Sequence, residues 1–464
     1  MRLSPRLFRA LGWCALVIGA SAGPFVALAG LEGDEAAARG FFSTAVVGLF
    51  VGGLVLAGTA RLTQPAGAAE ALRLSFYAWV LTPLLAAPPL AAGAGGAIGG
   101  VFEAFSALTT TGAILAEPEQ VSRSVVLWRC YLAWLGGLAS LVLAATVFAA
   151  LDRRGVGLRR TSLLTVERSD LFTNFGRGFR RLGAVYGLVT TLGAVLMMSA
   201  GAAPFDALCL ALSGIATAGL SPQSGPLLDW APPATVIALA LVCLAGAWNF
   251  AVMYEWLSRY RIQRGTGELR AMAGVALGAG VAALLLAGPG AFPTGVLDGL
   301  FAISTAGFTA SSGFAFPAVA LFCLGLVGGA TISTSGGVKM PRVLLLLRRA
   351  GGELSLLSHP SAAVRTRFGG RPVSDSALAG VWVYALAFPV ALGVGAVMIA
   401  LGGAEFGPAW RTAAASVTNM GPPAAADFAG LPPASLLASC VLMVAGRLEV
   451  MAAAAAVYVI FARD

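Results

Sequence analysis

Four short stretches of the sequence combine threonine, small residues and glycine in a pattern that could bind a cation. The fullest is residues 102–113, a short apolar run that ends in three threonines and a glycine. A dehydrated cation needs several oxygens at close range, and stacked backbone carbonyls can supply them. Glycine adopts the positive-φ conformations that turn such carbonyls inward at little cost. The predicted filter residues are Thr110, Thr111, Gly112, Thr217, Ala218, Gly219, Thr305, Ala306, Gly307, Asn419, Met420 and Gly421.

Each of these stretches follows a short apolar helix candidate and precedes a polar loop. Irregular backbone at membrane depth is tolerated only where it is buried in protein or lines a water-filled path. The alternative is that the small residues merely let helices pack closely. Such patches are expected to be common in this chain, because it contains 60 glycines. Recurrence in one structural context favours four re-entrant pore loops that meet on one axis.

An acidic residue stands near the predicted start of each short helix. A carboxylate there is favoured by the helix dipole and is a common cap, so a structural role is sufficient. These four acids are Glu103, Asp206, Asp298 and Glu405.

The elements that must position these loops are membrane-spanning helices. The chain is 58% hydrophobic and 11% charged, which is typical of a polytopic membrane protein and leaves no room for a soluble domain of useful size. We expect an all-α fold, because a span needs about 20 mostly apolar residues and ten segments qualify. They are, approximately, 8–30, 41–59, 74–95, 124–150, 181–201, 233–257, 269–288, 315–347, 377–402 and 433–461.

Charge placement predicts the orientation of these spans. Arginines precede the first span, flank the fourth and fifth, and lie between the sixth and seventh, while the opposite side is mainly acidic. The positive-inside rule then puts both termini in the cytoplasm, consistent with an even number of spans. The same bias explains the net charge of +9 without a nucleic-acid partner. We therefore interpret the basic residues as a surface that faces membrane lipid.

From residue 74 a unit of span, short pore helix, filter loop and return span repeats. We expect the four units to have a pseudo-fourfold arrangement. The predicted divisions are an N-terminal two-span hairpin at 1–70 and pore repeats at 71–165, 166–262, 263–372 and 373–464.

The return span of the third unit contains a poor helix, residues 328–337, rich in glycine, serine and threonine. Two interpretations stay open: a mobile gate beneath the filter, or a tight helix-packing patch. The predicted gate residues are Thr331, Ser333, Thr334, Ser335, Gly336, Gly337, Lys339 and Arg447.

Arg447 lies midway along the last predicted span, two residues before Glu449. A charged residue at that depth is expected to have a function. The alternative is that Arg447 forms a buried structural pair with a residue of another span. Residues two apart on a helix do not face each other, so the two side chains should have different partners.

The sequence gives little support to other chemistry. The six cysteines are scattered without a CxxC motif, and the single histidine, His359, lies in a predicted cytoplasmic loop without a catalytic partner. Neither HExxH nor GxSxG occurs, so we do not expect an enzyme. A secondary transporter of another cation or small solute is the alternative, but two-span repeats keep one orientation, which disfavours inverted repeats.

The chain resembles the Trk/Ktr/HKT superfamily of potassium transporters, and most of all its TrkH-like membrane subunits, from about residue 74 to the end. The matching stretches are Phe102-Glu103-Ala104, Thr109-Thr110-Thr111-Gly112-Ala113, Trp134-Leu135-Gly136-Gly137, Ser304-Thr305-Ala306-Gly307-Phe308-Thr309, Gly336-Gly337-Val338-Lys339, Asn419-Met420-Gly421-Pro422 and Gly446-Arg447-Leu448-Glu449.

This resemblance implies one potassium pathway in a bacterial plasma membrane, with an intramembrane gate loop and a pore-facing arginine. It implies K+ as the transported ion with no bound cofactor. It also implies a homodimer and a TrkA-like cytoplasmic nucleotide-binding regulatory subunit. The chain itself has no P-loop or Rossmann fingerprint. All four filter glycines are retained, which favours potassium, whereas the gate loop has one glycine fewer than is usual.

Overall fold

The computed structural model describes residues 5–59, 68–144, 171–259, 267–313, 316–359, 366–368, 371–421 and 427–461. Two predicted unit boundaries, at 165 and 262, lie outside these residues, as do the basic residues between positions 145 and 170. Helices dominate the described chain, and the one ladder there pairs β1 (Arg367–Phe368) with β2 (Arg371–Pro372).

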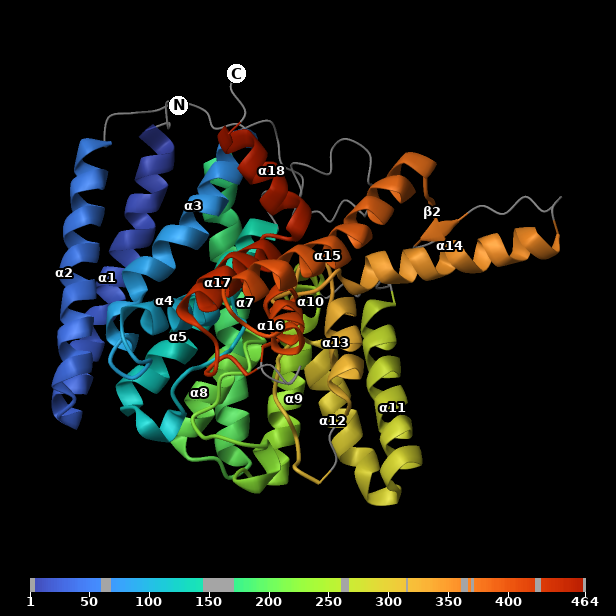
Figure 1. The fold of residues 1–464 in the computed structure, drawn as a ribbon, viewed down its shortest axis with the longest axis horizontal. Coiled ribbons are helices and arrows are strands. Elements are labelled where there is room, and N and C mark those ends of the chain that lie inside the picture. The colour runs from blue at the N-terminus through green and yellow to red at the C-terminus, as the bar shows by residue number, and fades with distance from the viewer. Residues whose placement is uncertain are drawn as a thin grey trace.

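The first two helices form an antiparallel hairpin at one edge of the molecule (Figure 1). They are α1 (Pro5–Glu32) and α2 (Glu35–Gly58), and Asp34 caps α2 by accepting a hydrogen bond from Ala37 N at 2.9 Å. Gly19 and Gly48 bring the two backbones into contact, because a Cβ at either position would collide with the other helix. This is the close approach that small residues allow between helices.

The remaining helices form the body beside this hairpin (Figure 1). The first unit contains α3 (Ala68–Ala86), α4 (Ala97–Leu108) and α5 (Arg123–Leu143). The second contains α7 (Leu171–Ser199), α8 (Pro204–Ile215), α9 (Pro233–Ala247) and α10 (Phe250–Arg259). The third contains α11 (Glu268–Ala287), α12 (Phe292–Ile303), α13 (Ala318–Val327) and α14 (Met340–Ser358). The fourth contains α15 (Asp375–Leu401), α16 (Phe406–Thr418), α17 (Pro433–Arg447) and α18 (Val450–Phe461).

Four of these helices, α4, α8, α12 and α16, have only 12 or 13 residues. At 1.5 Å per residue each is about 18–20 Å long, well short of a bilayer core of about 30 Å. Short 3-10 turns lie beside some of them, at Pro88–Leu90, Pro118–Gln120, Leu227–Asp229 and Pro289–Ala291. The short helices therefore enter the membrane region without crossing it.

Two predicted continuous spans are wrong in detail, because each is sharply bent. The α9–α10 pair bends by 99° and the α17–α18 pair by 105°. At the first bend Asn249 caps the new helix by accepting from Ala251 N at 3.0 Å, and at the second Glu449 has a φ of 60°. The predicted span at 315–347 is also interrupted, as the sequence indicated, between α13 and α14.

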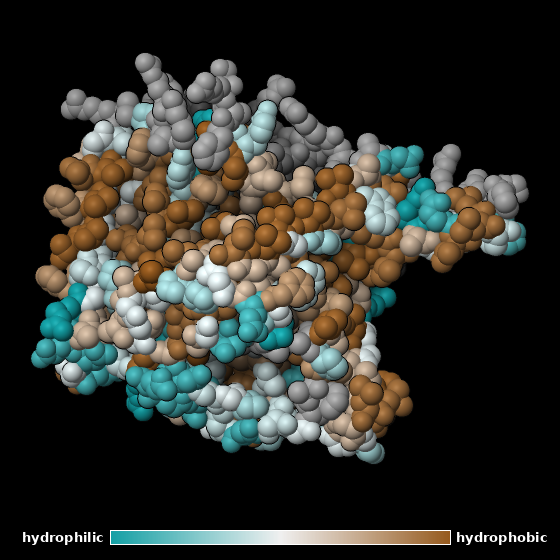
Figure 2. Space-filling model, viewed as in Figure 1, coloured by the Kyte–Doolittle hydropathy of each residue, from teal (hydrophilic) through white to brown (hydrophobic). Residues whose placement is uncertain are grey.

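The described chain has six helices long and apolar enough to cross a membrane, or eight if each bent pair is one span. The other two of the ten expected crossings fall on α3, whose apolar part is short, and on the interrupted α13–α14 segment. Hydrophobic side chains cover the flank of α1 and α2 and much of the protruding α14–α15 arm, while hydrophilic ones gather along the lower rim (Figure 2). The protein is therefore a multi-pass membrane protein.

We predict that Gly48→Leu destabilises the protein by about 1–3 kcal/mol, because the added side chain must push α1 away from α2. Thermal unfolding in detergent measures the effect. Gly53→Leu is the matched control, since its Cβ would meet no heavy atom within 4 Å. Equal melting temperatures for the two variants would contradict the backbone contact.

Candidate functional site

Each of the four short helices ends in the same backbone motif. In the first loop Thr110 N donates to Ala107 O at 2.9 Å and Thr111 N donates to Ser106 O at 2.8 Å. This is the Schellman closure, which satisfies carbonyls that a helix end leaves without partners. The paired bonds recur at residues 217–218, 305–306 and 419–420.

The motif needs a left-handed residue within two residues of each helix end. Thr110, Thr217, Thr305 and Asn419 have φ angles of 56°, 52°, 56° and 52°. Two residues later come the four glycines, 112, 219, 307 and 421, with φ angles of 77°, 72°, 78° and 69°. Left-handed threonine is uncommon and costs free energy, so the surrounding packing must hold it in place. The four predicted filter loops thus share one backbone conformation.

Contacts between three of the glycines and carbonyls place the loops side by side, in the order fourth, first, second, third. A Cβ built on Gly112 would collide with the carbonyl oxygen of Ala218 in the second loop, and one on Gly219 with that of Ala306 in the third. A Cβ on Gly421 of the fourth loop would collide with the carbonyl oxygen of Thr111 in the first. At these three positions any residue larger than glycine would force neighbouring loops apart.

The fourth loop is also fixed to the first by side chains. Asn419 Nδ2 donates to Thr111 Oγ1 at 3.1 Å and to Met443 O on α17 at 3.0 Å. Thr111 Oγ1 lies 2.9 Å from Thr109 Oγ1. All four side chains in this set are buried, so the hydrogen bonds replace those that water would otherwise make.

The structure corrects the role predicted for two of the four acids. Glu103 and Asp298 stand in the middle of α4 and α12, not at their starts. Glu103 accepts from Leu115 N at 2.9 Å and Ala116 N at 3.2 Å, and Asp298 accepts from Ala310 N at 2.7 Å. Both therefore brace the chain that leaves a predicted filter loop, in the first and third units.

The other two acids lie where the sequence predicted. Asp206 is in the first turn of α8, and Glu405 directly precedes α16. Asp206 also accepts from Gln223 Nε2 at 3.3 Å, in the loop beyond the second filter.

Arg129 on α5 is a site residue that the sequence interpretation missed. Its Nε and Nη2 donate to Glu103 Oε2 and Oε1 at 2.9 and 2.8 Å, and its Nη1 donates to Ala116 O at 3.0 Å. Both side chains are at most 3% exposed. A bidentate pair of this kind fixes geometry, and losing one partner would strand a buried charge. A charged residue inside a predicted membrane span is costly without a partner, so the position of Arg129 in such a span could have identified it from the sequence.

The segment between α13 and α14 lies against three of the four units. Thr334 Oγ1 donates to Ile215 O at 2.8 Å and to Gly246 O at 2.9 Å, both in the second unit. In the third unit, Gly336 N donates to Thr305 Oγ1 at 2.7 Å, so the segment contacts one of the predicted filter loops directly. A Cβ on Gly336 would collide with Thr418 O, at the end of the fourth short helix.

Hydrogen bonds inside the segment hold its folded shape. Ser333 Oγ donates to Ala330 O at 2.6 Å and lies 2.8 Å from Ser335 Oγ, which accepts from Gly329 N at 3.0 Å. Lys339 Nζ donates to Ser335 O and lies 3.4 Å from Ser333 Oγ. Thr331 is half-buried at the start of this turn, and Gly337 packs its α-carbon against α13.

Arg447 reaches the same segment from the end of α17. Its Nη1 donates to Thr334 O at 2.6 Å, and its Nε donates to Ser140 Oγ on α5 at 2.6 Å. Within the described part of the chain no carboxylate forms an ion pair with it. Arg447 thus connects the first, third and fourth units.

Glu449 has different partners from Arg447, as the sequence predicted. It pairs with Arg342 of α14 at 2.9 Å and accepts from the Tyr384 hydroxyl of α15. The Arg342 guanidinium also stacks 3.8 Å from the Tyr384 ring centroid, a cation–π contact. This cluster ties the bend between α17 and α18 to the first turn of α14.

Two acidic side chains, Glu117 and Glu119, lie beyond the first predicted filter loop and bind the chain beyond the second. Ser224 Oγ donates to Glu117 Oε2 at 2.7 Å, and Ser224 N donates to Glu119 Oε1 at 2.7 Å. The bonds from Ser224 hold the pKa of Glu119 below its ordinary value. The loops of the first and second units are therefore joined beyond the filter.

The fold and these loops define a class of polytopic membrane proteins built on re-entrant helix–loop units. The family model described as "TrkH: Cation transport protein" matches residues 41–271 and 294–463. The chain belongs to the TrkH family of cation transport proteins.

Named relatives and a solved structure agree with this membership. The chain is 28% identical over 368 residues to the Trk system potassium uptake protein TrkH of Halomonas elongata, covering 75% of this chain and 76% of that one. It is 29% identical over 399 residues to TrkI of the same organism, covering 82% and 81%. The crystal structure of the potassium transporter TrkH from Vibrio parahaemolyticus superposes with a TM-score of 0.86 at 24% identity, covering 99% and 98%. The predicted fold class is confirmed.

We predict that Gly112→Ser lowers the potassium-to-sodium permeability ratio, because its Cβ displaces the Ala218 carbonyl of the neighbouring loop. Reversal potentials or competitive uptake in vesicles measure the ratio. Gly95→Ser is the matched control, since Gly95 also has a positive φ, of 75°, but open space around its Cβ. An unchanged ratio in a folded Gly112→Ser protein would count against a filter at this loop.

We predict that Arg447→Ala raises cation flux about tenfold, because losing a charged hydrogen bond of about 1.5 kcal/mol releases the segment beneath the filter. Ion preference should stay close to that of the unchanged protein. Uptake rate per folded molecule is the measurement, with monodispersity by gel filtration as control. Normal folding with unchanged or lower flux would contradict this role.

Proposed function

We propose that this protein takes up potassium across the bacterial plasma membrane through a selectivity filter built from its four loops. The observation that carries the proposal is the fourfold repetition of one left-handed loop, with glycines packed against the carbonyls of neighbouring loops. Backbone carbonyls held at fixed spacing can replace the hydration shell of a potassium ion. The named relatives are potassium uptake proteins, which supports this choice of ion.

In this proposal the filter consists of the Thr-Thr-Gly, Thr-Ala-Gly, Thr-Ala-Gly and Asn-Met-Gly loops that begin at residues 110, 217, 305 and 419. Backbone carbonyls of these loops supply the ligands. The partial negative charge at the C-terminal ends of α4, α8, α12 and α16 adds attraction for a cation. Glu103 and Asp298 hold two of the loops in place without touching the ion.

The segment of residues 331–339 acts as the gate beneath the filter. Its hydrogen bonds to Ile215, Gly246 and Thr305 favour a closed position, and Arg447 acts as a latch on Thr334. The permanent charge of Arg447 also raises the barrier for a cation below the filter. Opening requires these few hydrogen bonds to be exchanged for others or for water.

The proposal includes partners and an orientation. The chain acts as a transporter and not as an enzyme. It forms a homodimer, and a TrkA-like cytoplasmic nucleotide-binding subunit controls the gate. Both termini face the cytoplasm, because the basic loops require it and because the start of α1 and the end of α18 lie at the same end of the molecule (Figure 1).

We predict that the gene rescues growth of a potassium-uptake-deficient bacterium on low potassium, and that co-expression of a TrkA-type subunit increases the rescue. Rubidium uptake in vesicles measures the flux directly. A variant carrying Gly112→Ser and Gly219→Ser is the negative control, since both substitutions force neighbouring loops apart. If the vesicles take up an amino acid or a sugar but no rubidium, the protein transports another solute and the proposal is wrong.

A further inference from the structure

One position in the four short helices carries a different side chain in each unit. It lies seven residues before the left-handed residue that follows each helix, and the side chain there is buried in every unit. The four residues are Glu103, Leu210, Asp298 and Thr412. Two units therefore place a carboxyl group at this position, and two units place an uncharged side chain there.

In the first unit the charge of this carboxylate is compensated. Glu103 forms a bidentate pair with Arg129 of α5, and the two side chains are 1% and 3% exposed. The opposite charges lie 2.8 Å apart, so the pair exerts little net field on a cation at the loops. The role of Glu103 is therefore to hold the first loop in place.

In the third unit the charge of Asp298 has no such partner. Its Oδ1 accepts a hydrogen bond from Ala310 N at 2.7 Å, and no basic side chain in the described chain forms an ion pair with it. The helices that pack most closely on α12 are α9, α11 and α13. The one basic residue in these three helices is Arg270, which is exposed in the first turn of α11. The charge of Asp298 is therefore not compensated by its neighbours.

The Asp298 carboxylate lies beside the chain that leaves the third loop. Ala310, whose N–H it accepts, follows Gly307 by three residues, and Ser312 donates to a second carboxylate there, that of Asp229, at 3.4 Å. The Asp298 side chain is 5% exposed, so salt screens its charge less than it screens a surface carboxylate. Its field reaches the third loop through protein, where the effective dielectric constant is about 20.

We propose that Asp298 sets the affinity of the four-loop filter for potassium through this uncompensated charge. The inference rests on the proposed transport function and adds to it the residue that attracts the ion. A fixed negative charge near a narrow entrance raises the local concentration of cations and their rate of entry. The carboxylate acts through its field and does not touch the ion. The attraction is therefore one-sided, from the third unit, although the four loops share one backbone conformation.

Two substitutions separate the charge of Asp298 from its hydrogen bond. Asp298→Asn keeps an oxygen for Ala310 N and removes the charge, whereas Asp298→Glu keeps the charge and displaces the carboxylate by one methylene. We expect Asp298→Asn to raise the KM of rubidium uptake in vesicles about fivefold at an unchanged kcat, and Asp298→Glu to stay within about twofold of the original KM. A change of about fivefold is the order expected for one charge that acts across roughly 13 Å at a dielectric constant of about 25.

A purely structural role of Asp298 predicts the reverse order of the two variants. Asp298→Asn would then match the unchanged protein in KM and kcat, and Asp298→Glu would lower kcat or the melting temperature. That result, or an equal change of KM in both variants, would overturn the inference. If Asp298→Glu does not fold, the KM of Asp298→Asn at an unchanged melting temperature decides between the two roles.

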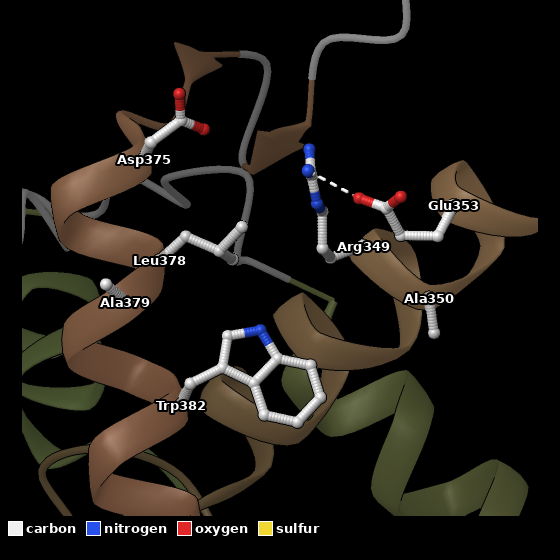
Figure 3. A pocket seen from close by; sticks show the side chains of 7 residues that line it. All are labelled: Arg349, Ala350, Glu353, Asp375, Leu378, Ala379 and Trp382. Carbon is white, nitrogen blue, oxygen red and sulfur yellow. Dashed lines mark ion pairs between the residues drawn. The ribbon is translucent and has the colours of Figure 1, made fainter. Parts of the chain in front are cut away.

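Asp375→Asn is the matched control. Asp375 lies in the first turn of α15, on the protruding arm, where it lines an open pocket with Glu353 and Trp382 (Figure 3). This carboxylate also forms no ion pair within the described residues, but it is exposed and belongs to none of the four loops. Its loss should leave the KM of rubidium uptake unchanged.

Failure of the inference and failure of the transport proposal give different results. If the unchanged protein takes up no rubidium, the transport proposal is wrong, whereas equal KM values with and without the Asp298 charge refute only the inference. Thermal unfolding of the purified protein at increasing potassium concentration tests the attraction without transport, because a bound ion stabilises the folded state. Asp298→Asn should need about fivefold more potassium for the same rise in melting temperature. The same requirement in both proteins, or no stabilisation of either, would overturn the inference.

Discussion

The structure depends on satisfying irregular backbone where water is scarce. Each short helix stops at membrane depth, so its last carbonyls need new partners there. The Schellman closure supplies them four times, at the cost of a left-handed residue and a glycine in every loop. The packing of Gly112, Gly219 and Gly421 against neighbouring loops then makes the four loops depend on one another. A change in one loop therefore strains its neighbour.

The segment between α13 and α14 obeys the same constraint with different means. Its backbone departs from a helix over 12 residues, 328–339, and its carbonyls and amides are bonded to serines and threonines of the segment, to α9 and to Arg447. Four of these partners, Gly246, Ala247, Phe250 and Arg447, come from other units. Hydrogen bonds, together with the packing of Ile332 and Val338 in the apolar core, thus hold the segment in place.

The four units are equivalent in their loops but not in what supports them. The first loop is braced by a buried Arg129–Glu103 pair and the third by Asp298 alone, whereas α8 and α16 carry their acids at or before their first turn. The bends also differ, since α9–α10 turns at Asn249 and α17–α18 at Glu449. The repeated sequence therefore fixes the conformation of the four loops, whereas the residues that support the loops differ from unit to unit.

The sequence by itself determined the features that depend on local chemistry: the apolar helices, the short helices that stop at threonine and glycine, and the glycine-rich break after α13. It could not determine the 99° and 105° bends, because the apolar pattern runs on through both. It also misplaced Glu103 and Asp298 and overlooked Arg129. Their roles arise from partners 12 to 26 residues away, and those of Arg447 and Glu449 from partners 65 to 307 residues away. Only tertiary packing brings such groups within hydrogen-bonding distance, because a buried charge takes whichever partner the fold presents to it.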